Sequence, residues 1–175
     1  MKSRAPSTHK KVVLRKLDRG VIKGYVNPGS YLTTAGVELL DHQGRLTDVP
    51  LAELKGVFFV RDFEGDSRRV ERKVFRSRPK RRGLWVRLTF RDNEILEGII
   101  PNNLLDLHPS GFLVIPPDLY SNNLKVFVPR GALRALDVLA VISGAGGRRT
   151  ILRGSEARQA ARIGLLRSSG GSETD

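Results

Sequence analysis

A run of basic residues near the middle of the chain offers the side chains best suited to binding an anion. Guanidinium groups are planar and donate paired hydrogen bonds to phosphate or carboxylate oxygens. Phe75 and Trp85 lie within or beside the run and offer rings on which a base can stack. The basic residues are Arg68, Arg69, Arg72, Lys73, Arg76, Arg78, Lys80, Arg81 and Arg82, with Glu71 among them. We predict a polyanion-binding surface here, and the alternative is a solvated linker between two domains.

Amide side chains and one further arginine are the other candidates for binding. Asn102 and Asn103 can donate to and accept from the edge of a base, as can Asn122 and Asn123. Such pairs also cap turns, which is the alternative interpretation. The predicted nucleic-acid or nucleotide-binding residues are Arg68, Arg69, Arg72, Lys73, Arg76, Arg78, Arg81, Arg82, Arg130, Asn102 and Asn103.

The sequence contains no arrangement of residues typical of catalysis or metal binding. Cysteine is absent, which removes disulfides, thiolate nucleophiles and cysteine-based zinc sites. His9, His42 and His108 are far apart in the sequence, and no pair of acids is spaced for general acid and base roles. Neither a Walker loop nor a G-x-G-x-x-G motif occurs. We therefore expect a protein that is not an enzyme, with no catalytic residues, no metal and no cofactor.

Composition narrows the class of partner. The 175 residues carry a formal charge of +13, which favours nucleic acid, phosphorylated small molecules or an anionic membrane face as partner. No apolar run approaches the roughly 18 residues needed to span a bilayer, and the basic N-terminal segment has no apolar centre. We therefore predict no transmembrane segment and a cytoplasmic location.

An internal repeat organises most of the chain. Residues 11–26 align without a gap on residues 85–100, which places Asp18 on Asp92 and Gly24 on Gly98. Further on, Val49 and Pro50 correspond to Val128 and Pro129. A repeat of this kind predicts two copies of one supersecondary unit.

Short runs of apolar and β-branched residues within each copy predict strands. In residues 85–90, Val86, Leu88 and Phe90 alternate with Arg87 and Thr89, the period of a half-buried strand. The expected strands are residues 12–17, 21–26, 37–40, 46–49 and 56–62 in the first copy, and 85–90, 95–100, 111–115, 125–128 and 136–142 in the second. Single helical turns are expected at 50–54 and 130–133.

A tight turn is expected between the first two strands. Gly20 is predicted to take a positive φ there, and Asp18 to cap its own backbone.

These elements predict an all-β fold of two small five-stranded β-barrels in tandem, because strands this short need closure to protect their edges. The predicted organisation is a leader at 1–10, a first repeat at 11–62, an Arg-rich connector at 63–83, a second repeat at 84–143 and a flexible, partly helical basic tail at 144–175.

Two motifs resemble those of Sm-like proteins. Residues 86–98, VRLTFRDNEILEG, resemble the first Sm motif, and residues 129–133, PRGAL, resemble the second. The resemblance implies two bent five-stranded barrels and, in RNA-binding members, a nucleotide pocket that includes the arginine matched by Arg130. Leu104 and His108 stand where that pocket has an Asp and an Asn, and Leu51-Ala52 replaces Arg-Gly in the first copy. The chain is also similar to duplicated barrel domains of bacterial regulatory and signalling proteins.

A second resemblance concerns the connector. The spacing of Arg68 and Arg72 resembles the R-x-x-x-R motif of PilZ domains, whose arginines bind cyclic di-GMP. The accompanying D/N-x-S-x-x-G motif does not follow at its usual place. Binding of a nucleic acid, RNA or a single strand, by a regulatory protein is the leading functional prediction. A cyclic-dinucleotide sensor and a protein-interaction adaptor are the alternatives.

Overall fold

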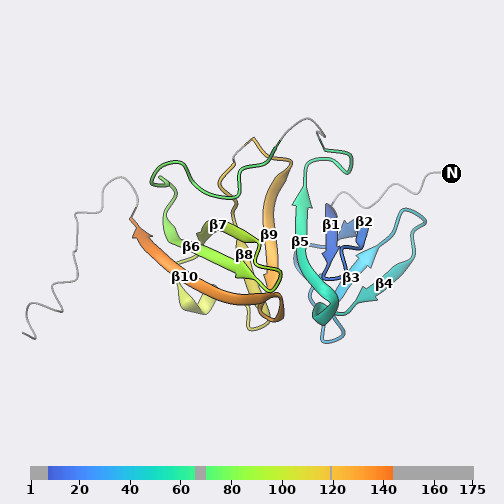
Figure 1. Cartoon of the computed structure of the whole chain (residues 1–175). Coiled ribbons are helices and arrows are strands. Elements are labelled where there is room, and N and C mark those ends of the chain that lie inside the picture. Colours follow the sequence, from blue (N-terminus) through green and yellow to red (C-terminus); the bar gives the residue numbers. More distant parts are fainter. Residues whose placement is uncertain (1–7, 66–69, 119, 144–175) are drawn as a thin grey trace, which may run out of the picture. The chain divides into compact units, whose positions relative to one another are not determined.

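The computed structural model describes residues 8–65, 70–118 and 120–143, and all regular elements in them are β-strands or three-residue 3-10 turns (Figure 1). The predicted all-β class is therefore confirmed. The strands are β1 (Lys10–Lys16), β2 (Val21–Val26), β3 (Val37–Leu40), β4 (Leu46–Val49), β5 (Leu54–Val60), β6 (Gly83–Phe90), β7 (Ile95–Ile100), β8 (Gly111–Val114), β9 (Asn123–Pro129) and β10 (Leu133–Ile142). The turns are η1 (Leu51–Glu53), η2 (Leu104–Asp106) and η3 (Arg130–Ala132). The helix predicted in the tail lies outside the described residues.

The strands follow the predicted apolar pattern closely. β2, β3, β4 and β7 have the predicted limits, whereas β6 and β10 begin earlier, at Gly83 and Leu133. Val86 and Leu88 are fully buried while Arg87 between them is exposed, as the alternation predicts. The helical turns expected before β5 and β10 are η1 and η3.

The turn between β1 and β2 has the predicted hydrogen-bonded cap, but a different residue has the positive φ. The Gly20 amide donates to Asp18 Oδ1 at 2.8 Å, as expected. The positive φ, however, is at Arg19 (72°), and Asn93 has the same role in the second repeat (64°). The second repeat has Glu94 at the position of Gly20, and its amide donates to Asp92 Oδ1 at 3.1 Å in the same way.

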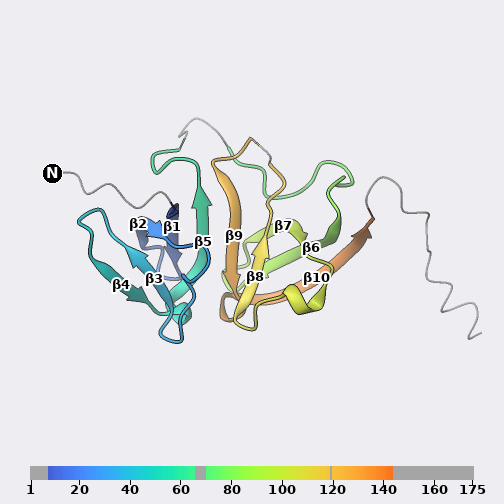
Figure 2. The same cartoon turned by 180° about the vertical axis from the view of Figure 1, so that it is seen from behind.

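Antiparallel ladders join the strands into two sheets, and the larger sheet crosses the boundary between the repeats. One has seven strands in the order β4-β3-β2-β1-β5-β9-β8, and the other has three in the order β10-β6-β7. β8 and β9 of the second repeat thus extend the sheet of the first, and a bridge between Ile99 and Ile115 connects them to β7. Figure 2 shows β9 between β5 and β8.

The core consists of two clusters that share the β5–β9 pair. Val57 and Phe59 of β5 pack in the cluster of the first repeat. Phe58 and Val60, on the opposite face of the same strand, pack in the cluster of the second. A strand buried on both faces in this way connects the packing of one repeat to the other.

In the described part of the chain the helical segments are 3-10 turns of three residues, so none has the length and hydrophobicity of a membrane-spanning helix.

Candidate nucleic-acid interface

Residues 70–82 of the connector run along the second repeat and are fixed there by Glu97 of β7. The Glu97 side chain is only 3% exposed. Its Oε2 accepts hydrogen bonds from the Phe75 amide at 3.0 Å and from Trp85 Nε1 at 3.1 Å. The Glu97 amide in turn donates to the Lys73 carbonyl at 2.7 Å. One residue of the sheet therefore binds the connector through both its backbone and its side chain.

Arg87 neutralises the charge of this buried carboxylate. It stands directly opposite Glu97 in the β6–β7 ladder, and its Nη2 donates to Oε1 at 2.8 Å. Burial alone would raise the pKa of Glu97, but the hydrogen bonds from Arg87, Phe75 and Trp85 hold that pKa below its ordinary value. Glu97 is consequently ionised at neutral pH.

Glu71 and the aromatic rings provide further anchors. Glu71 accepts hydrogen bonds from the side chains of Ser121, in the loop before β9, and Asn123, the first residue of β9. Phe75 packs edge-to-face on Trp85 with the ring centroids 5.7 Å apart. Residues 71–75 are thus held against the protein by backbone and side-chain contacts.

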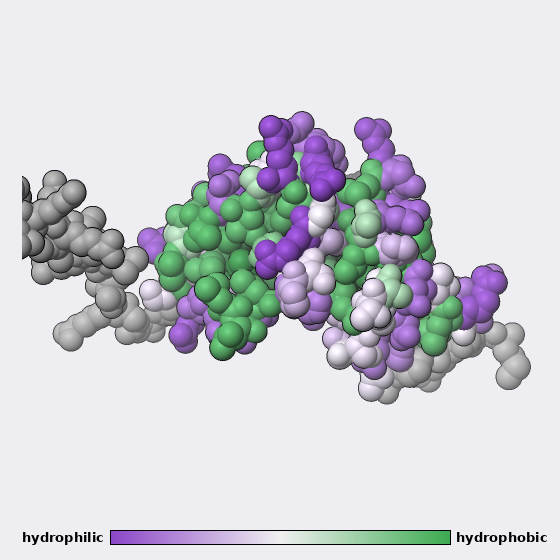
Figure 3. All heavy atoms as spheres, turned by 90° about the horizontal axis from the view of Figure 1, so that it is seen from below, coloured by the Kyte–Doolittle hydropathy of each residue, from purple (hydrophilic) through white to green (hydrophobic). Residues whose placement is uncertain are grey.

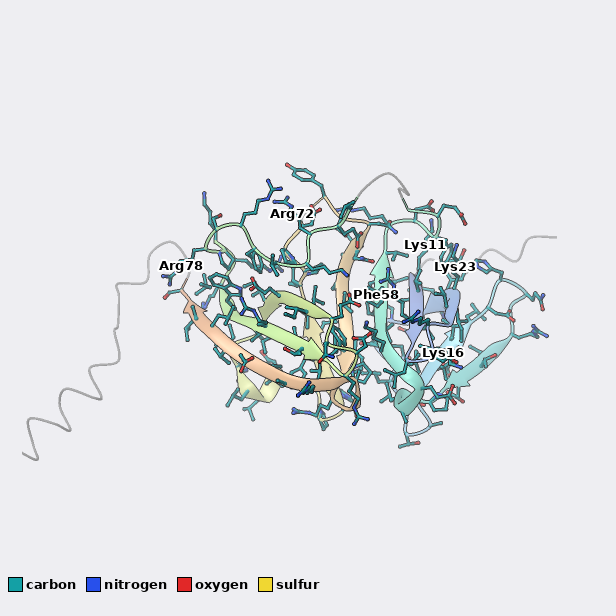
Figure 4. The ribbon with its side chains drawn as sticks, viewed as in Figure 1. Lys11, Lys16, Lys23, Phe58, Arg72 and Arg78 are labelled. Carbon is teal, nitrogen blue, oxygen red and sulfur yellow. The ribbon has the colours of Figure 1, made fainter. Side chains whose placement is uncertain are left out.

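The arginines of the connector line a groove of about 260 Å³. Its apolar lining includes Ile99, Ile115 and three prolines. Its basic lining is formed by Arg72, Arg76, Arg78, Lys80 and Arg81. Figure 4 shows Arg72 and Arg78 on the upper side of the second repeat, with Arg78 beside the end of β10. Arg78 Nη2 lies 3.4 Å from the Val141 carbonyl there.

Apart from Arg78, which contacts the Val141 carbonyl, the described basic residues of the connector fall into two groups. Arg72 lies 3.7 Å from Asp118, and Lys73 lies 2.9 Å from Glu94, so these two charges are partly compensated. The second group has exposed side chains and makes no ion pair within the described part of the chain; it consists of Arg76, Lys80, Arg81 and Arg82. We call this second group the outer cations. Arg68 and Arg69 lie outside the described residues.

A larger hollow of about 650 Å³ lies on the other side of the connector and is lined by charges of both signs. Lys23 pairs with Glu64 at 3.2 Å on its wall, and Asp62 on the same wall pairs with Lys11 at 3.0 Å. The exposed ring of Tyr120 borders it. The lining of this hollow contains three acids, Asp62, Glu64 and Glu71, whereas the lining of the groove contains none, so the hollow suits a polyanion less well than the groove.

The remaining predicted residues do not line the groove. Arg130 donates from Nε to the Pro109 carbonyl at 2.7 Å and covers the Phe112 ring. Asn103 caps η2 by accepting a hydrogen bond from the Leu105 amide at 3.2 Å. This is the turn-capping role that was the alternative to base binding. Asn102 is exposed beside it. The candidate interface is therefore the connector, without the amide pair.

Sequence reasoning missed Glu97, although a signal for it exists. An acid inside the apolar run of residues 95–100 is unusual, and the predicted hairpin places Arg87 opposite it. A paired Arg and Glu next to a basic segment indicates an attachment point for that segment.

The chain belongs to a family of unknown function, DUF6982, whose model matches residues 8–140. This match includes both repeats and the connector, so the family unit is the duplicated structure and not a single repeat. No curated protein and no solved structure matches the chain.

Proposed function

We propose that the protein is a regulatory nucleic-acid-binding protein without enzymatic activity, built from two Sm-like repeats, and that the connector contacts single-stranded RNA or DNA. The observation that carries the proposal is the anchored connector. Glu97 and Glu71 fix residues 71–75 to the second repeat, while the outer cations that follow have no acidic partner in the described residues. Anchoring the backbone of residues 71–75 restricts where the cations that follow can lie, which lowers the entropy lost when they meet a phosphate backbone.

The expected binding depends on phosphate contacts and not on base sequence. Phe75 and Trp85, the rings closest to the connector arginines in the sequence, contact each other, and Trp85 also donates to Glu97. Arginine and lysine on phosphates supply affinity and orientation but carry no sequence information. We therefore expect similar affinity for single strands of different sequence.

The Sm-like assignment is supported by the order of the strands. Within the first repeat the order is β4-β3-β2-β1-β5, and a short 3-10 turn separates β4 from β5. The second repeat has the same turn, η3, in the segment that resembles the second Sm motif.

Binding of a fluorescent oligonucleotide of about 20 nucleotides, measured by anisotropy at about 50 mM salt, tests the proposal. The variant Arg76→Gln/Arg81→Gln/Arg82→Gln should bind about 10- to 100-fold more weakly, because it removes three phosphate contacts. The matched control is Lys10→Gln/Arg19→Gln/Arg91→Gln, which loses the same charge at exposed positions elsewhere. Equal weakening in both variants, or no binding by the wild type, contradicts the proposal.

Calorimetry with cyclic di-GMP distinguishes the proposed nucleic-acid binding from the alternative, in which the protein senses a cyclic dinucleotide. Saturable binding that Arg68→Ala and Arg72→Ala abolish, in a protein that does not bind the oligonucleotide, would replace the proposed function with that of a cyclic-dinucleotide sensor. Arg72 is partly compensated by Asp118, which is the reason we favour the nucleic acid.

A further inference from the structure

A separate pocket of about 280 Å³ lies between the loop after β2 and the loop after β7, and β9 forms part of its lining. It shares no residue with the groove of the connector. It also differs from the nucleotide pocket that the Sm resemblance implies, because Arg130 does not line it and contacts the Pro109 carbonyl and the Phe112 ring instead. Its volume is close to the lower end of the range for small-molecule sites, roughly 300 Å³.

Tyr31, in the loop after β2, brings a hydroxyl without a protein partner to this pocket. The residue is 9% exposed, and its ring packs edge-to-face on Phe59 and Phe127, with centroids 5.4 and 6.0 Å away. Within the described part of the chain the hydroxyl makes no hydrogen bond, and no fully buried side-chain oxygen lacks a partner. The hydroxyl therefore keeps accessible surface, and Tyr31 lines the pocket. A phenylalanine would fill the same space in the core, so packing does not account for the hydroxyl.

Lys125 of β9 adds a positive charge that no acid compensates. It stands opposite Phe59 in the β5–β9 ladder, and its Nζ lies 4.5 Å from the centroid of that ring. Tyr31 contacts the same ring. Lys125 forms no ion pair with any residue that the structure describes. A hydroxyl donor and an ammonium group thus line one pocket and have Phe59 as a common neighbour.

His108 and Asp106, in the loop after β7, are the other titratable groups of the lining. His108 Nδ1 accepts a hydrogen bond from the Ser110 amide at 3.1 Å, so the neutral ring carries its proton on Nε2 and is a third donor. Asp106 accepts a hydrogen bond from Asn103 Nδ2 at 3.0 Å in the η2 turn. Donors therefore outnumber acceptors in the lining, which favours a ligand that carries acceptor atoms and a negative charge.

The second repeat provides an apolar side of the pocket through Pro101, Leu107 and Leu113. Hydrophobic side chains gather over this repeat in the view from below (Figure 3). A few polar groups together with apolar walls are the usual composition of a small-molecule site, in which the polar groups fix the orientation of the ligand.

We propose that this pocket binds a small carboxylic acid with an apolar body, whose carboxylate accepts hydrogen bonds from Tyr31 Oη and Lys125 Nζ. Burial raises the pKa of Tyr31 to about 12, so the hydroxyl is protonated at neutral pH and donates. The apolar body packs against Leu107 and Leu113. One lysine balances one negative charge, which suits a monocarboxylate better than a phosphate dianion.

Ligand-observed NMR titration of the full chain with benzoate, phenylacetate and 3-phenylpropionate tests the inference. At least one acid should bind with a Kd of about 1 mM or tighter. The matching amide has the same shape without the charge and should bind at least about 10-fold more weakly.

Two variants each remove one proposed contact. Tyr31→Phe and Lys125→Met should each weaken binding of the acid by about 10-fold or more. Tyr31→Phe should unfold at the same denaturant concentration as the wild type, because the hydroxyl has no hydrogen bond to lose. The matched controls are Tyr25→Phe and Lys10→Met, which lie outside the pocket lining and should bind as the wild type does.

Several outcomes would overturn the inference. These are no binding of any acid at up to about 10 mM, equal binding of acid and amide, or unchanged binding by Tyr31→Phe or Lys125→Met. Tighter binding of adenosine or uridine monophosphate than of every acid, weakened by the same variants, would make the pocket a nucleotide site. None of these outcomes affects the oligonucleotide test, because the outer cations lie on the connector.

Discussion

At the scale of single residues, the placement of the connector depends on one buried carboxylate. Oε2 of Glu97 accepts hydrogen bonds from Phe75 in the connector and from Trp85 in β6. Its Oε1 accepts a hydrogen bond from Arg87. A carboxylate that is buried and fully hydrogen-bonded is costly to alter, because its partners are left without an acceptor.

Replacing Glu97 with glutamine tests this role. Glu97→Gln should lower the free energy of unfolding by about 1–3 kcal/mol at neutral pH, because Arg87 loses its charged partner. The folded-state pKa of Glu97 is lowered, so its stabilising contribution is present above the unfolded pKa of about 4.3 and is lost as pH falls through the folded value. Urea unfolding from pH 7 to about pH 3 should therefore show a smaller stability loss in the variant than in the wild type. Parallel pH profiles would contradict this.

Gly98 is a second residue whose identity is fixed by its surroundings. A Cβ at Gly98 would lie 2.2 Å from Val114 Cγ1 and 2.8 Å from the Ile115 carbonyl, where β7 crosses β8. Its counterpart Gly24 is equally close to the Leu40 carbonyl, at 2.7 Å. The repeated glycine marks where each hairpin approaches the next strand.

We expect Gly98→Ala to destabilise the protein by about 1–3 kcal/mol through overpacking. Gly131→Ala, at a position with no neighbouring atom within 4 Å of the added Cβ, should change stability by less than about 0.5 kcal/mol. Chemical denaturation of both variants measures the difference in their stability. Equal denaturation midpoints would show that the close contact at Gly98 does not destabilise the alanine variant.

At the scale of elements, β5 is the strand that joins the repeats. Phe58 belongs to the first repeat by sequence but packs in the hydrophobic cluster of the second, and it is 8% exposed. The two repeats should therefore unfold together, although the sequence suggests two lobes.

Phe58→Ala tests this coupling. It should cost about 3–5 kcal/mol and keep a single transition, in which the fluorescence of the sole tryptophan, Trp85, coincides with far-UV circular dichroism. Val21→Ala, at a 57% exposed position in the first repeat, should have little effect. Two separated transitions, with Trp85 unaffected by the substitution, would mean that the repeats fold independently.

The sequence predicts the strands well because each depends on a local pattern, as the alternation around Val86 and Leu88 shows. It does not predict the partner of β5, because strand pairing between distant segments leaves no local trace. The fully apolar run of residues 57–60 was the available signal, since a strand buried on both faces lacks alternation. The basic connector was likewise predicted from composition, but its attachment through Glu97 depends on a tertiary contact.

At the scale of the whole molecule, the residues that form the fold and the unpaired cations lie in different segments of the chain. The core and the ladders use the repeated positions, while the outer cations lie in the connector, which the repeat does not include. The central claim is that this segment binds the backbone of a nucleic acid.

The most direct measurement of that claim is the salt dependence of oligonucleotide binding by the wild type and by Arg76→Gln/Arg81→Gln/Arg82→Gln. For a single strand, each phosphate contact contributes about −0.7 to the slope of log K against log salt concentration, so the variant's slope should be shallower by about 2. The same slope in both proteins, or a flat response in the wild type, would contradict the account.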